Sequence, residues 1–144
     1  MKLGIVGHGA DKFTPETALL AKARIRANIK AYSAQLVVSG RSPLGGVDIW
    51  AEEIAHELSI PTLIFPASTN QWDGPGGFKY RNLQIAHNSD VVLCVVVKSL
   101  PPPYQGRRFE YCYHCRTQEH VKSGGCWTGK QAKACIWEVV ESKQ

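Results

Sequence analysis

The sequence lacks the features of several classes of protein. No apolar run approaches the roughly 20 residues that a membrane-spanning helix requires. No internal repeat and no linker long enough to separate two domains is visible, so residues 1–144 are expected to form one domain around one core. Met1, Lys2 and Leu3 lead directly into a predicted strand, so we expect no signal peptide and a cytoplasmic protein.

Acidic residues are scarce in one part of the chain. Between Lys98 and Lys133 there are seven basic and two acidic residues, whereas the rest of the chain carries ten of each. The net charge of +5 therefore comes entirely from this segment. A local basic patch suits a phosphate-bearing ligand or a nucleic acid, and the alternative interpretation is a solvated surface loop.

Apolar segments that alternate with helical patterns predict an α/β fold. Val91–Val97 consists of seven apolar residues without polar alternation, which is typical of a central strand covered on both faces. Thr14-Pro15-Glu16 is a helix start, with Thr as the N-cap. The order of elements predicts a mostly parallel sheet of about five strands. The predicted strands are Lys2–Val6, Gln35–Val38, Ile60–Phe65, Val91–Val97 and Ile136–Val140, and the helices are 15–32, 47–58, a short one before Val91, and 128–134.

Glycine-rich loops follow several of the predicted strands. In an open parallel sheet, ligands bind beyond the C-terminal ends of the strands, where these loops gather. Gly45-Gly46 and Gly124-Gly125 each lie close to a predicted helix start, where backbone N–H groups favour a phosphate. Arg81 and Asn82 are expected at a third helix start. The alternative interpretation of the glycine pairs is that they only form turns, which need glycine in any case. The pattern predicts a site for a phosphate or ribose-phosphate group.

Four stretches of the chain resemble the SLOG superfamily. They are VVSGRSPLGGVDIWAEEIA, IFPAS followed by Trp72, YRNLQIAHNSDVVLCVV and SGGCWTGKQA, and together they cover most of the chain outside 98–122. This superfamily includes LOG-type phosphoribohydrolases, the DNA-processing protein of natural transformation, and small phage and bacterial YspA/YpsA-like proteins. The chain is most similar to the YspA-like group, through Gly46-Val47-Asp48, Phe65-Pro66-Ala67 and Arg81-Asn82.

The resemblance implies a fold and a class of ligand. It implies a Rossmann-like three-layer sandwich that binds a nucleotide or a nucleotide-derived, ADP-ribose-like molecule, and relatives that often form dimers. A homo-oligomer is therefore expected, and Trp50, which is expected to be exposed on the second helix, would suit an interface. The expected ligand-binding residues are Gly7, Gly9, Ser39, Gly40, Asp48, Arg81, Asn82, Gly124, Gly125 and Thr128.

The hydrolase motif of the LOG-type enzymes is only partly present. Those enzymes have Pro-Gly-Gly-x-Gly-Thr-x-x-Glu, whereas this chain has Ser123 in place of the proline and Gln131 in place of the glutamate. A glutamine cannot take up a proton or stabilise an oxocarbenium ion as a carboxylate does. An N-glycosidic hydrolase or transferase acting on nucleotides is therefore the alternative function, with Asp48 or Glu52 as the catalytic carboxylate. These acids could instead have a structural role at a helix N-terminus.

Cysteine and histidine residues cluster in the basic segment. Cys112-x2-Cys115-x4-His120-x5-Cys126 has the spacing of a zinc knuckle, and His114 could replace His120. A structural zinc would stabilise residues 98–125, an insertion that begins with three prolines and contains little apolar surface. Reduced thiols without metal and a catalytic metal are the alternatives. Cys94 and Cys135 lie in apolar segments and are expected to be packing residues, and no disulfide is expected in a reducing compartment.

Aromatic residues are interleaved with arginines in the same insertion. The arginines are Arg107, Arg108 and Arg116, and the aromatic residues around them are Tyr104, Phe109, Tyr111, Tyr113 and Trp127. Such a mixture can stack nucleobases and neutralise phosphates, so a nucleic-acid-binding module is a third possible function. The aromatic residues could instead cover the edge of the sheet.

Overall fold

The protein is built around a parallel β-sheet of five strands. The computed structural model describes residues 1–142, and in these the strands lie in the order β3-β2-β1-β4-β5. Every neighbouring pair is parallel. The α/β fold class expected from the sequence is therefore confirmed. The strands are β1 (Lys2–Gly7), β2 (Leu36–Ser39), β3 (Thr62–Ile64), β4 (Val91–Val97) and β5 (Cys135–Val140), and the helices are α1 (Pro15–Ala31), α2 (Val47–Glu57), α3 (Phe78–His87) and α4 (Gly124–Gln131).

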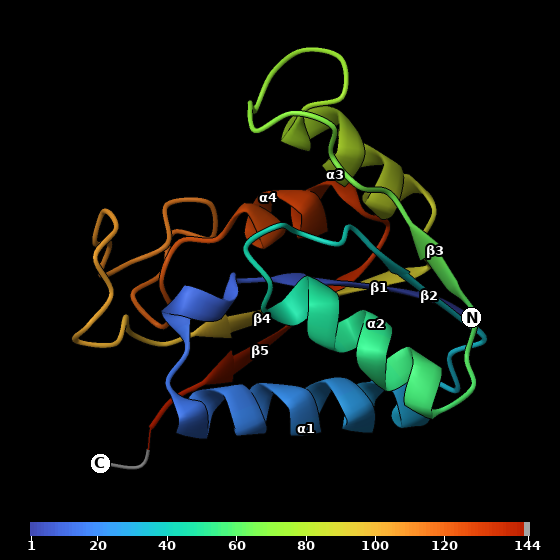
Figure 1. Cartoon of the computed structure of the whole chain (residues 1–144), viewed down its shortest axis with the longest axis horizontal. Helices are drawn as coiled ribbons and strands as arrows, with labels where there is room; N and C mark the ends of the chain where they lie inside the picture. The colour runs from blue at the N-terminus through green and yellow to red at the C-terminus, as the bar shows by residue number, and fades with distance from the viewer. Residues whose placement is uncertain (143–144) are drawn as a thin grey trace.

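Helices cover both faces of the sheet. Helices α1 and α2 lie on one face, and α3 and α4 lie on the other (Figure 1). Alternate residues of β4 pack against the two helix layers, because successive side chains of a strand point to opposite faces. Leu93 and Val95 pack with the α1–α2 layer, whereas Val92 and Cys94 pack with the α3–α4 layer. This arrangement is the Rossmann-like three-layer sandwich.

The helix before β5 begins earlier than the sequence pattern indicates. Residues 128–134 were the expected range, but α4 runs from Gly124 to Gln131. Ser123 explains the difference, because its hydroxyl oxygen accepts a hydrogen bond from the backbone N–H of Gly125 at 3.0 Å and so caps the helix. The insertion between β4 and α4 therefore comprises residues 98–123.

Trp50 is less exposed than expected. Its indole ring packs edge-on against Phe13, with 4.9 Å between the ring centroids, and the ammonium of Lys22 lies 5.2 Å from the indole ring. The side chain is thus partly buried against the apolar core on the α1–α2 face. A dimer interface based on an exposed Trp50 has no support in this geometry.

The insertion has little secondary structure and is held by backbone and side-chain contacts. Cys112 and Thr117 form an isolated antiparallel bridge, which closes a short hairpin around Cys115. The guanidinium of Arg108 donates hydrogen bonds to the carbonyls of Leu100, Pro101 and Tyr104. These contacts fold the proline-rich start of the insertion back onto itself. Among the residues that the structure describes, no helix has the length and apolar character needed to cross a membrane.

Candidate functional site

Two adjoining cavities lie at the C-terminal edge of the sheet. The chain leaves β1 in one direction towards β2 and later returns to the other side of β1 as β4, so the strand order reverses between β1 and β4. In open α/β sheets this position forms a crevice where ligands bind. We call the cavity of about 340 Å³ that contains Asp48 and Arg81 the sheet-edge cavity, and the cavity of about 490 Å³ under the insertion the insertion cavity. They share Gly7, Ser42, Leu44, Lys122 and Gly124.

Most of the expected ligand-binding residues converge on these cavities. Gly9 lines the insertion cavity. Ser39 and Gly40 line neither of the two cavities, because the hydroxyl of Ser39 donates to the carbonyl of Ile5 at 2.8 Å and Gly40 packs under Arg81. The sheet-edge cavity is lined by the other seven, which are Gly7, Asp48, Arg81, Asn82, Gly124, Gly125 and Thr128.

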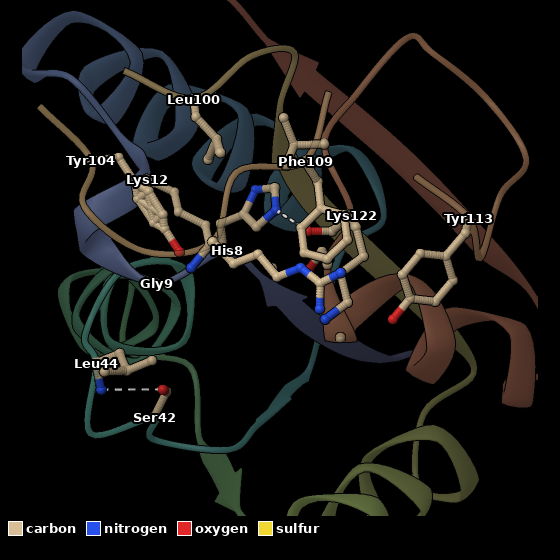
Figure 2. A pocket seen from close by; sticks show the side chains of 15 residues that line it. His8, Gly9, Lys12, Ser42, Leu44, Leu100, Tyr104, Phe109, Tyr113 and Lys122 are labelled. Carbon is tan, nitrogen blue, oxygen red and sulfur yellow. Dashed lines mark hydrogen bonds between the residues drawn. The ribbon is translucent and has the colours of Figure 1, made fainter. Parts of the chain in front are cut away.

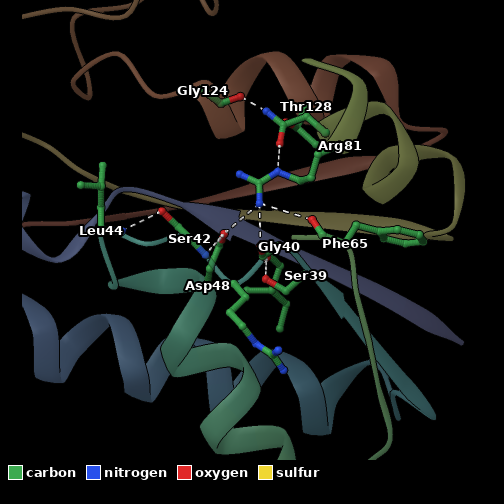
Figure 3. Close-up of polar contacts among 12 residues, drawn as sticks. Ser39, Gly40, Ser42, Leu44, Asp48, Phe65, Arg81, Gly124 and Thr128 are labelled. Carbon is green, nitrogen blue, oxygen red and sulfur yellow. Dashed lines mark hydrogen bonds and ion pairs between the residues drawn. The ribbon is translucent and has the colours of Figure 1, made fainter. Parts of the chain in front are cut away.

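The side chain of Arg81 is buried and connects α3 with the loops that follow β2 and β3. Its Nη1 donates a hydrogen bond to the carbonyl of Gly40 at 2.7 Å, and its Nε donates to Oδ1 of Asn82 at 2.7 Å (Figure 3). A Cβ atom at position 40 would collide with the guanidinium, so this contact requires glycine. The sequence marked Arg81 as a ligand-binding residue but gave no sign of this structural role, because the partner is a backbone carbonyl 41 positions away.

Arg81 also forms a buried ion pair with Asp48. Nη1 of Arg81 lies 3.9 Å from Oδ2 of Asp48, and both side chains are only 8% exposed. Burial raises the pKa of Asp48 to about 6, although Arg81 and the backbone N–H of Ser42 act in the opposite direction. Burial likewise lowers the pKa of Arg81. Both shifts arise because desolvation of the charges outweighs their attraction.

The second expected carboxylate lies elsewhere. Glu52 accepts two hydrogen bonds from the guanidinium of Arg41, each at 3.0 Å, and does not line either cavity. This bidentate pair occupies both carboxylate oxygens. Asp48 is therefore the expected catalytic residue that the cavity exposes to a ligand.

The two glycine pairs serve different purposes. A Cβ atom on Gly46 would lie 2.5 Å from the carbonyl oxygen of His8, so glycine here allows two loops to pack against each other. The first backbone N–H of α2, that of Val47, donates to the same carbonyl at 3.2 Å. In contrast, a Cβ atom on Gly124 would meet nothing within 4 Å. Gly124 therefore presents an open backbone surface at the boundary of the two cavities.

The helix start before Arg81 is occupied by the chain itself. Helix α3 begins at Phe78, and the N–H groups of Phe78 and Lys79 donate to the carbonyls of Gln71 and Trp72 at 2.9 and 3.0 Å. The loop before α3 thus satisfies the first donors of this helix. Arg81 reaches the sheet-edge cavity through its side chain rather than through an open helix end.

Three cysteines and a histidine could hold a metal ion. The ligand atoms of Cys112, Cys115, His120 and Cys126 all lie within 4.8 Å of one another. Nδ1 of His120 is 3.0 Å from the carbonyl oxygen of Val121, which can only accept a hydrogen bond. Nδ1 therefore carries the proton, and Nε2 is left with the lone pair that a metal requires. Metal-binding histidines usually make such a backbone contact.

The sulfur of Cys126 lies beside the thiol of Cys94. The Sγ atom of Cys94 lies 3.9 Å from that of Cys126, and donation from the Cys94 thiol is the main cause that lowers the pKa of Cys126 to about 5. The indole nitrogen of Trp137 also lowers this pKa, but it makes no hydrogen bond to the sulfur. It is the one buried side-chain nitrogen or oxygen within residues 1–142 that lacks a hydrogen-bond partner. A thiol donor beside a buried sulfur fits a thiolate bound to a metal.

His8 links the sheet to the insertion, a role that sequence reasoning did not detect. The backbone N–H of Val97 donates to Nδ1 of His8 at 3.1 Å, which fixes the proton on Nε2. Nε2 then donates to the carbonyl of Lys122 at 2.9 Å (Figure 2). Burial lowers the pKa of His8 to about 4, so the ring is neutral at pH 7. A single ring thus joins the ends of β1 and β4 to the segment that returns to α4.

Comparison of the chain with models of known protein families, and with curated proteins, gives no match. The function is therefore inferred from the geometry described above.

Proposed function

We propose that this protein binds a nucleotide or a nucleotide-derived molecule, such as an ADP-ribose-like compound, in the sheet-edge cavity. The proposal rests above all on the convergence of seven expected ligand-binding residues on one cavity at the β1–β4 crevice. The volume of about 340 Å³ falls within the range of small-molecule sites. The resemblance of Gly46-Val47-Asp48, Phe65-Pro66-Ala67 and Arg81-Asn82 to the SLOG superfamily supports the same ligand class.

The cavity offers separate surfaces for the two ends of a nucleotide. A phosphate would lie at Gly124, beside the N-terminus of α4 and the ammonium of Lys122. The base would lie against apolar and aromatic side chains, including Ile85, Trp72 and Phe78. Arg81 and Asn82 lie between these surfaces as polar groups that could orient the ribose.

Gly124→Leu is the variant that tests this site most directly. Because a Cβ atom at position 124 would meet nothing within 4 Å, the backbone there should accept a side chain, and a leucine would extend into the boundary of the cavities. We expect at least one of the four common nucleoside monophosphates to bind in isothermal titration calorimetry. The variant should weaken that binding by roughly tenfold or more, since a side chain replaces the space for the phosphate.

Gln131→Leu is the matched control, since it adds the same side chain at the exposed end of α4 and away from the cavity. Its affinity should equal that of the unmodified protein. Failure of nucleotides of every kind to bind, or equal binding by the Gly124→Leu protein, would refute the proposed site.

The raised pKa of Asp48 and its position in the cavity favour a second candidate function, the cleavage of an N-glycosidic bond in a nucleotide. A carboxyl group with a pKa raised to about 6 that faces a cavity has the character of a catalytic acid or base. Incubation with each nucleoside monophosphate should then release free base, detected by chromatography. Asp48→Asn should abolish the release, whereas Glu52→Gln should retain it. Binding without any released base would leave the protein as a binding module.

We also propose that the metal of the Cys112, Cys115, His120 and Cys126 group is zinc, with a structural role. Three thiolates and one imidazole form the closed ligand set of structural zinc sites. In a tetrahedral site with Zn–S bonds of about 2.3 Å, the ligand atoms lie about 3.8 Å apart. The limit of 4.8 Å among the four atoms here requires only small side-chain adjustments. Bound zinc would join the hairpin of the insertion to the first turn of α4.

A further inference from the structure

The insertion cavity has a strongly one-sided charge. Its fifteen lining residues include the cations Lys12, Arg107 and Lys122 and no acidic residue. Lys12 lies 3.6 Å from the carboxylate of Asp11. Within the described part of the chain, neither Arg107 nor Lys122 forms an ion pair. The cavity is therefore a place where a negatively charged group would be attracted.

Aromatic rings hold these cations at the cavity wall. The ammonium of Lys12 lies 5.0 Å from the ring of Tyr104, and the guanidinium of Arg107 lies 5.0 Å from the ring of Phe109. Lys122 lies 5.8 Å from the ring of Tyr113. Figure 2 shows Tyr104 and Lys12 on one side of His8, and Phe109, Lys122 and Tyr113 on the other. Planar rings beside cations provide both stacking surface and charge, which together suit a nucleobase attached to a phosphate.

The insertion cavity adjoins the sheet-edge cavity. Five residues line both, and among them Lys122 and Gly124 lie where we place the phosphate of a nucleotide. A mononucleotide in the sheet-edge cavity would leave the cavity of about 490 Å³ beside it unfilled. A second ring system joined through the same phosphates would fill it.

We propose that the ligand is a dinucleotide-type molecule, in which two planar ring systems are joined through one or more phosphates. This inference rests on the proposed function, because one half of the molecule occupies the sheet-edge cavity. The bridging phosphates lie between Lys122 and Gly124. The second half lies in the insertion cavity, with its ring beside Tyr113 and the guanidinium of Arg107.

The experiment compares each nucleoside monophosphate with the matching symmetrical dinucleoside diphosphate by isothermal titration calorimetry. The dinucleoside diphosphate should bind roughly tenfold to hundredfold more tightly, because stacking of a second base adds to the affinity. Arg107→Gln should remove most of this gain and leave monophosphate binding unchanged, since Arg107 lines only the insertion cavity. Arg116→Gln is the control, because it removes the same charge from the insertion outside both cavities.

The outcomes separate the two proposals. If the monophosphates bind but the dinucleoside diphosphates bind no more tightly, the second subsite is refuted and the nucleotide site stands. Equal losses in the Arg107→Gln and Arg116→Gln proteins would indicate general attraction by a basic surface, and would also refute the subsite. Tighter, salt-sensitive binding of a ten-nucleotide single strand would favour the nucleic-acid module instead. If no nucleotide of any kind binds, both proposals fail.

Discussion

Arg81 shows how one residue can serve both the fold and the site. Its guanidinium contacts the carbonyl of Gly40 and the carboxylate of Asp48, and the same side chain lines the sheet-edge cavity. Replacing it therefore removes a possible ligand contact and leaves a buried acid without its cation. A loss of ligand binding in an Arg81 variant would not distinguish these effects, which is why Gly124 is the better position for a binding test.

We expect Arg81→Ala to lower the free energy of unfolding by about 3–5 kcal/mol at pH 8, because it leaves Asp48 buried without its ion-pair partner. The pKa of Asp48 is about 6, which already exceeds that of an unfolded aspartate, and it should rise further in the variant. The folded variant then binds more protons than the unfolded chain, so its stability should fall as the pH rises from 5 to 8. Urea unfolding at both pH values measures this.

The double variant Arg81→Ala/Asp48→Asn should recover part of the loss, since the buried charge is gone. Arg26→Ala offers a contrast, because Arg26 pairs with Glu57 at the surface and both side chains are more than a third exposed. That change should cost no more than about 1 kcal/mol. Equal costs for Arg26→Ala and Arg81→Ala would contradict the buried ion pair.

At the scale of elements, the insertion is the part of the chain that most needs an additional support. Between β4 and α4 it has one isolated β-bridge, and its four candidate metal ligands lie on the hairpin, on the returning segment and in the first turn of α4. A metal bound by all four would connect these three pieces. The basic and aromatic wall of the insertion cavity would then depend on the metal for its position.

Elemental analysis of the purified protein should find about one zinc per chain, and Cys115→Ser should reduce this content because a thiolate ligand is lost. The variant should also melt at least roughly 5 °C lower, since metal-binding free energy contributes to folding. Cys135→Ser is the control, because Cys135 is not one of the four grouped ligands and should retain the zinc. A zinc content far below one per chain in the unmodified protein would exclude the zinc site.

At the scale of the whole molecule, the sheet was the easiest part to predict. Alternating strand and helix patterns are local, so the sequence indicated a parallel sheet with a buried strand at Val91–Val97, and both predictions are confirmed. The middle position, however, belongs to β1, with β4 between β1 and the edge strand β5. The start of α4 was harder to predict, because Gly124 and Gly125 are not typical of a helix, although the helix begins there with Ser123 as its N-cap. Strand β3 is only three residues long, since just that part of the predicted segment finds a partner in β2.

The candidate site was harder to predict than the fold because side-chain roles depend on distant partners. The sequence pattern selects the loops at the sheet edge but does not say which loop residues face outward. Ser39 turns towards β1, and Glu52 pairs with Arg41. His8 carried no local signal at all, since its two partners are 89 and 114 positions away. The four candidate metal ligands could be predicted because their spacing in the sequence is itself the signal.

The position of β1 in the sheet has a consequence for synthesis of the chain on the ribosome. Strand β1 pairs with β2 early in the sequence, but its other neighbour is β4, which begins at Val91. Until residue 97 has emerged, the strands β1, β2 and β3 can form only a partial sheet, with one side of β1 unpaired. An apolar strand edge of this kind can pair with another chain. The nascent protein should therefore be most prone to aggregation, and most dependent on chaperones, just before β4 is made.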